Sequence, residues 1–138
     1  MYVTITEVHQ EEAGGEFVDV IDDCGASLES TTCENELDLG SSLGNNCSVD
    51  VGSSAGNTRA GRTTYYHMNV AAQRARVYLP ANNWVRNPVG AHVNINNNCN
   101  AVWGGNRVNM FREGSGCRNT GESPTVVIHE WGHGMDQN

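Results

Sequence analysis

Apolar and polar residues alternate in three stretches of the chain, which is the pattern of half-buried β-strands. Residues 2–8 and the run from Phe17 to Ile21 predict two short strands. Residues 89–96 alternate strictly and predict a third. The apolar face of that third strand consists of Val89, Ala91, Val93 and Ile95. Between the second and third strands, residues 22–61 are rich in Ser, Gly, Asn, Asp and Thr, which predicts loops with short strands.

Residues 100–111 predict a β-hairpin. One strand runs from Asn100 to Trp103, a turn follows at Gly104-Gly105, and a second strand runs from Val108 to Phe111. Two glycines suit a tight hairpin turn because glycine adopts positive φ without strain. Residues 113–123 form a glycine-rich loop in this interpretation.

A helix is predicted over residues 63–79, with Thr63 or Thr64 as its cap and Pro80 as its stop signal. Its apolar residues recur three and four positions apart, which indicates one buried face. That face consists of Tyr65, Met68, Ala72, Ala75 and Leu79. The polar residues His67, Asn69, Gln73, Arg74 and Arg76 fall largely outside it.

A second helix is predicted from about residue 124 into the low 130s. Ser123 is an N-cap and Pro124 takes the first helical position. The apolar side consists of Val127, Trp131 and Met135, with Ile128 beside them. Gly132 and Gly134 each cost about 1 kcal/mol relative to alanine inside a helix. Their presence predicts that another backbone or a ligand approaches the helix closely there.

Charge is distributed unevenly along the 138 residues. Residues 1–58 hold 12 acidic groups and no basic one, whereas residues 59–138 hold 4 acidic groups and all 8 arginines. The net charge of −8 disfavours nucleic acid as a partner. No apolar run approaches 18 residues, which excludes a spanning helix and disfavours a membrane partner. The acidic segment predicts a solvated face; a Ca²⁺ site using Asp22, Asp23 or Asp50 is the alternative.

Five cysteines stand at positions 24, 33, 47, 99 and 117. The sequence contains no C-x-x-C pair, which disfavours a cysteine-type zinc site. Five cysteines in a chain rich in Gly and Asn favour an oxidising compartment, so we expect a secreted or periplasmic protein. Cys99 and Cys117 flank the predicted hairpin and are expected to form a disulfide. Cys24, Cys33 and Cys47 then supply one further bridge and leave one thiol over.

The second helix contains His129-Glu130-Trp131-Gly132-His133, an H-E-x-x-H motif. Composition alone predicts roughly 0.01 such matches in a chain of this length. Residues four apart lie on one helical face, so His129 and His133 are expected to bind one Zn²⁺. Glu130 lies beside that face and is expected to act as general base toward a zinc-activated water. Asp136, three residues after His133, is expected at the helix end rather than as a third ligand.

Together with this motif, the order of helix, edge strand, hairpin and second helix in residues 57–138 resembles thermolysin-like and fungalysin-like zinc metallopeptidases, the gluzincins. The resemblance implies an α+β zincin-like subdomain in which a mixed or antiparallel sheet packs on two helices. It also implies that Asn100 and Ala101, at the edge strand, bind the backbone of a peptide substrate. Residues 1–56 form a separate acidic segment in this interpretation, either the start of the catalytic domain or the tail of a propeptide region.

The resemblance further implies a third ligand, a glutamate on a later helix, and an oxyanion-stabilising histidine. The sequence contains neither, so we expect a fragment of a longer secreted metalloendopeptidase. Its partner is a peptide or protein substrate; its oligomeric state stays open. Two alternatives remain: a non-enzymatic, disulfide-linked secreted binding module on a degenerate peptidase scaffold, and a zinc hydrolase of other specificity.

Overall fold

The computed structural model describes residues 18–25, 28–29 and 57–138. The predicted strand over residues 2–8 lies outside these residues, as do Cys33, Cys47 and Asp50. The described elements are the strands β1 (Val18–Asp22), β2 (Leu28–Glu29), β3 (Val89–Ile95), β4 (Ala101–Gly104) and β5 (Arg107–Phe111), the helices α1 (Arg59–Tyr78) and α2 (Pro124–Gln137), and two short 3-10 helices, η1 (Trp84–Arg86) and η2 (Thr120–Glu122). The predicted α+β class is confirmed.

The five strands form one mixed sheet in the order β2-β1-β3-β5-β4. The three inner strands β1, β3 and β5 are parallel, whereas β2 and β4 pair antiparallel at the two ends. β4 therefore lies at one edge, as expected for the strand that carries Asn100 and Ala101. The strand between the first helix and the hairpin, β3, was also expected at an edge; it pairs with β1 and β5 and is an inner strand, so that expectation is wrong. β1 comes from the acidic N-terminal segment and pairs with β3, so the sheet joins strands from both sides of the predicted boundary between residues 56 and 57.

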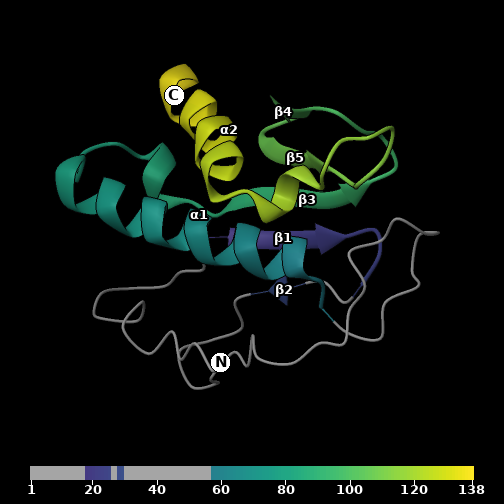
Figure 1. The fold of residues 1–138 in the computed structure, drawn as a ribbon. Coiled ribbons are helices and arrows are strands. Elements are labelled where there is room, and N and C mark those ends of the chain that lie inside the picture. Colours follow the sequence, from purple (N-terminus) through teal and green to yellow (C-terminus); the bar gives the residue numbers. More distant parts are fainter. Residues whose placement is uncertain (1–17, 26–27, 30–56) are drawn as a thin grey trace.

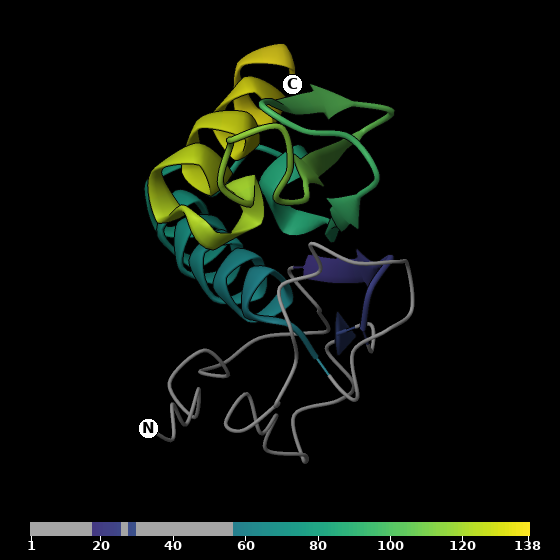
Figure 2. The same cartoon turned by 45° about the vertical axis from the view of Figure 1, so that its right-hand side comes forward.

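Both helices lie on the same side of the sheet, with α1 along the β1 half and α2 along the β4–β5 half (Figures 1 and 2). Every second residue of the inner strands points into the core between the layers. The core residues of the strands are Val18, Val20, Val89, Ala91, Val93, Val108 and Met110. Apolar and polar residues alternate in these strands because successive side chains of a strand point to opposite faces of the sheet.

The helix α1 begins at Arg59, four residues earlier than predicted, and its cap is Thr58 rather than Thr63 or Thr64. The Thr58 hydroxyl accepts a hydrogen bond from the Gly61 N–H at 3.0 Å. Of the predicted apolar face, Tyr65, Met68, Ala72 and Ala75 are buried. Leu79 is exposed because it follows the last helical residue. Asn69 is buried, contrary to expectation, and its amide donates to the Tyr65 carbonyl at 2.8 Å.

The strict alternation predicted for β3 breaks at its last two residues, Asn94 and Ile95. Asn94 has a φ of 58° and is buried, while Ile95 is only half-buried. The pairing of β3 with β5 shifts register between His92 and Ile95. The prediction of Ile95 on the apolar face is therefore wrong. The sheet turns Asn94 inward because its amide serves a buried polar network.

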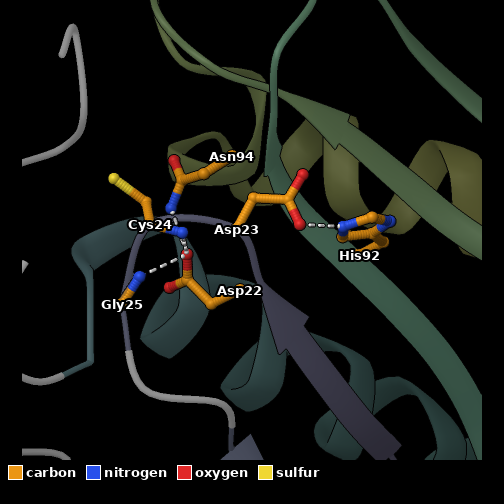
Figure 3. A network of polar contacts seen from close by, with 6 residues as sticks. All are labelled: Asp22, Asp23, Cys24, Gly25, His92 and Asn94. Atoms are coloured by element: carbon orange, nitrogen blue, oxygen red, sulfur yellow. Dashed lines mark hydrogen bonds and ion pairs between the residues drawn. The ribbon is translucent and has the colours of Figure 1, made fainter. Parts of the chain in front are cut away.

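That network connects β1, α1 and β3 through the Asp22 carboxylate (Figure 3). One of its oxygens accepts from the Cys24 and Gly25 N–H groups and from the Asn94 amide, at 2.9, 3.1 and 2.8 Å. The other accepts from the Thr58 hydroxyl at 2.6 Å. Buried polar groups need such partners, since an unpaired one costs about 1–3 kcal/mol. The network thus fixes where α1 begins.

The hairpin forms as predicted, with its turn displaced by one residue. Gly105 and Asn106 form the turn, with φ of 62° and 58°, whereas Gly104 still belongs to β4 and pairs with Arg107. Positive φ at both central residues defines the turn that matches strand twist, and Asn tolerates it nearly as well as Gly. The predicted disulfide between Cys99 and Cys117 is confirmed, with 5.1 Å between their Cα atoms.

Candidate functional site

The site is built on α2, whose start follows the predicted signals. The Ser123 hydroxyl accepts from the Val126 N–H at 3.5 Å, and Pro124 is the first helical residue. Val127 and Trp131 are buried, and Met135 packs against the core. These contacts fix the rotation of the helix about its axis, so the opposite face is presented to solvent.

His129 and His133 both lie on this solvent-facing side of α2. Their Nε2 atoms are 3.1 Å apart and the two rings are nearly perpendicular, at 85°. Two nitrogens bound to one tetrahedral Zn²⁺ at 2.0–2.1 Å lie about 3.3 Å apart. The donor type and the separation therefore both fit two ligands of a single metal ion.

Glu130 differs from the two histidines in its surroundings. Its side chain is only 7% exposed, because α2 presents it beside the exposed face rather than on it. Within the described part of the chain, no side chain donates a hydrogen bond to its carboxylate, and neither oxygen is among the fully buried unpartnered atoms. A carboxylate that is sheltered but not occupied is suited to accepting a proton from a group bound near the histidines.

The described residues place no third protein ligand beside the two histidines. Among the residues that the structure describes, no group of three or more His, Cys, Asp or Glu side chains gathers closely enough to hold a metal ion. Asp136 is exposed on the same helix and joins no such group. Any metal ion held by His129 and His133 thus needs further ligands from elsewhere.

The predicted substrate residues Asn100 and Ala101 lie at the start of β4. Ala101 is buried and pairs with Met110 of β5. Asn100 is exposed, and its carbonyl accepts from the Thr120 hydroxyl at 3.2 Å. Within the described sheet, β4 pairs on one side only, so its outer backbone groups remain available to an extended chain.

The structure adds residues that the sequence interpretation did not assign to the site. A Cβ built on Gly134 would lie 2.7 Å from the Trp103 ring and 2.8 Å from the Trp84 ring. The predicted close approach at Gly134 is confirmed, although indole rings make it rather than a backbone or ligand. At Gly132 a built Cβ would have no described atom from outside the helix backbone and its two chain neighbours within 4 Å, so the expectation was wrong there for protein neighbours. The presence of three tryptophans in a chain of 138 residues was the sequence feature that could have indicated this aromatic packing.

Two of the three carboxylates named for a Ca²⁺ site, Asp22 and Asp23, belong to the described residues, and both have protein partners. Asp22 accepts the four hydrogen bonds of the buried network, and Asp23 lies 2.5 Å from Nε2 of His92 (Figure 3). The His92 side chain is thus half-buried beside an acidic partner. Elsewhere, burial lowers the pKa of His67 on α1. Neither histidine lies on α2.

Comparisons of this chain with protein-family models, with curated proteins and with solved structures found no match. Within the described residues, neither helix has the length and apolar character that crossing a membrane requires. The site itself is consequently the basis for any functional conclusion.

Proposed function

We propose that this chain is part of a zinc-dependent endopeptidase. The observation that carries the proposal is the 3.1 Å separation of the His129 and His133 Nε2 atoms on an exposed helical face. Glu130, sheltered beside that face and free of hydrogen-bond partners among the described side chains, supplies the second element. The zincin-like fold and the gluzincin resemblance belong to the same proposal.

Each residue has a distinct role in this mechanism. His129 and His133 would hold Zn²⁺ through their Nε2 atoms. When bound, Zn²⁺ polarises the substrate carbonyl and lowers the pKa of a water toward about 7. Glu130 takes the proton of the attacking water and returns it to the leaving amine, so the carboxylate acts as general base and then as general acid.

The outer edge of β4, which pairs with no other described strand, is the element that selects an extended substrate. Its outward N–H and C=O groups suit β-strand addition by a peptide, beginning at Asn100 and Ala101. A peptide bound there lies beside α2, because Trp103 of β4 contacts that helix. The Cys99–Cys117 disulfide supports the secreted or periplasmic location that we propose with this activity.

The decisive experiment uses Glu130→Gln and His133→Ala in the protein that contains the whole chain. We expect Glu130→Gln to keep zinc and to lower peptide turnover by about 10²–10⁴-fold, because the general base is lost. His133→Ala should lose zinc, with a drop in zinc affinity of about 100-fold or more. Even the loss of a residue that only hydrogen-bonds to a metal ligand lowers metal affinity by about 10–100-fold. Zinc content is measured by mass spectrometry and turnover with a quenched fluorescent peptide.

Two controls separate these roles from misfolding. His92→Ala removes a histidine outside α2 and should leave zinc content unchanged. Both α2 histidines are exposed, so His133→Ala should keep the thermal midpoint that wild type shows in the absence of zinc. Unchanged zinc in His133→Ala would remove the ligand assignment. A wild type that binds zinc but cleaves only non-peptide bonds would indicate another hydrolase, and one that binds no zinc would favour the binding module.

A further inference from the structure

Two indole rings from outside the helix, Trp84 and Trp103, pack against the end of α2, and Trp84 also contacts Trp131 of the helix itself. We call these three residues the tryptophan clamp. The Trp84 ring lies 5.9 Å from the Trp103 ring and 5.5 Å from the Trp131 ring, centroid to centroid. Gly134 faces two of these rings so closely that a Cβ there would lie 2.7–2.9 Å from their atoms. The helix backbone therefore rests directly on aromatic surface.

Trp103 contacts α2 at two successive turns. Its ring lies against Gly134, and its indole N–H donates to the Gln137 side-chain oxygen at 2.7 Å. Because Gly134 directly follows His133, the first of these contacts is one residue away from the proposed zinc ligand. Trp103 itself belongs to β4, the strand whose outer edge pairs with no other described strand.

Trp131 connects the clamp to the other functional residue of the helix. It directly follows Glu130 in the sequence and is 5% exposed, so its packing limits rotation of α2 where the carboxylate is attached. Trp84 lies between Trp131 and Trp103 and closes the clamp. The contacts of the tryptophan clamp consequently fix both the rotation of α2 about its axis and its distance from β4.

We propose that Trp103 is a positioning residue that fixes the distance and rotation between the free edge of β4 and the helix carrying His129, Glu130 and His133. The inference rests on the proposed function. A peptide paired with β4 takes its position from the strand, whereas the zinc ligands and the base take theirs from α2. Misplacement by about 1 Å costs on the order of 10²-fold in rate, so a contact joining the two elements controls catalysis.

The test compares Trp103→Phe with wild type in the protein that contains the whole chain. Phenylalanine lacks the second ring that reaches Gly134 and the N–H that binds Gln137. We expect kcat to fall by about 10–100-fold, while KM changes less than about threefold because the β4 edge still binds the peptide. Zinc affinity, measured by titration with Zn²⁺ alone, should stay within about threefold because both histidines lie on one rigid helix.

Two further variants address the hydrogen bond itself. Gln137→Leu removes the acceptor and should lower kcat in the same direction, to a smaller extent. Gln137→Glu keeps an acceptor oxygen and should restore activity to near the wild-type level. Amide hydrogen exchange gives a readout besides activity: Trp103→Phe should speed exchange in both β4 and the last turns of α2.

Val20→Ala is the control for lost stability, because Val20 is buried in β1 on the opposite half of the sheet. It should lower the thermal midpoint without changing kcat at temperatures well below that midpoint. Equal kcat losses in Val20→Ala and Trp103→Phe would reduce Trp103 to a stabilising residue. A change in KM alone, or unchanged kcat and exchange, would also overturn the proposal.

The proposed function is tested separately, by measuring Zn²⁺ binding and peptide cleavage with the wild-type protein. If wild-type protein binds no Zn²⁺ and cleaves no peptide, the peptidase proposal fails, and the role of Trp103 fails with it. If wild type binds Zn²⁺ and cleaves peptide while Trp103→Phe matches it in kcat, only the positioning role is removed.

Discussion

The paired glycines of α2 offer a sharp test of the packing described above. Gly132 and Gly134 lie two residues apart in the same helix, on either side of His133. The same substitution, glycine to alanine, should act in opposite directions at the two positions. In a helix interior the change stabilises by about 1 kcal/mol, because alanine loses less backbone freedom on folding.

At Gly132 nothing opposes that gain, since an added Cβ meets no atom within 4 Å. At Gly134 the same Cβ would overlap the Trp103 and Trp84 rings at 2.7 and 2.8 Å. Overpacking of this kind costs about 1–3 kcal/mol or more. The rings cannot move away freely, because Trp103 is held by Gln137 and Trp84 by its contact with Trp131.

We therefore expect Gly132→Ala to be more stable than wild type by up to about 1 kcal/mol, and Gly134→Ala to be less stable by about 1–2 kcal/mol. For a chain of this size the two variants should differ in thermal midpoint by roughly 6–12 °C. Urea unfolding of both proteins, followed by circular dichroism, gives the two free energies directly. A Gly134→Ala variant as stable as Gly132→Ala would refute the reasoning.

The remaining predictions concern the polar groups of the fold. Asp22→Ala should lower the free energy of unfolding by about 3–5 kcal/mol, because it leaves several buried donors unpaired; Asp19→Ala, on the open face of β1, should change it by less than about 0.5 kcal/mol in the same urea titration. Burial raises the pKa of Glu122 above its ordinary value, against the opposing effect of Arg59 3.9 Å away. A raised native pKa means that stability is present below the unfolded pKa of 4.5 and is lost as pH rises through the native value. Glu122→Gln should therefore gain stability relative to wild type between acid and neutral pH; an unchanged difference across that range would contradict the burial cost.

Much of the fold could be predicted from the sequence where local and tertiary preferences agree. The α2 helix follows directly from Ser123-Pro124 and the spacing of Val127 and Trp131. The strand β1 follows from the run ending at Ile21, because one of its faces is buried. The Cys99–Cys117 disulfide follows from the place of both cysteines beside the hairpin.

The errors have a common physical origin in contacts between residues distant in sequence. Thr58 became the cap of α1 because its hydroxyl also donates to Asp22, 36 positions away. Asn94 turned inward for the same network, and Ile95 was displaced from the apolar face. No periodicity in a single sequence records such a partner, since each group looks locally like an ordinary loop or strand residue.

The properties of the candidate site also fall into those that follow from the local sequence and those that depend on tertiary contacts. The sequence alone determined that His129, Glu130 and His133 share neighbouring positions on one capped helix, because helical spacing is a local property. Only the tertiary structure decided that the two histidines are exposed while Glu130 is sheltered, and that Trp103 joins β4, an edge strand of the described sheet, to that helix. Those properties depend on which face packs against the sheet and on rings that meet across the core, and both are set by long-range packing rather than by the order of residues.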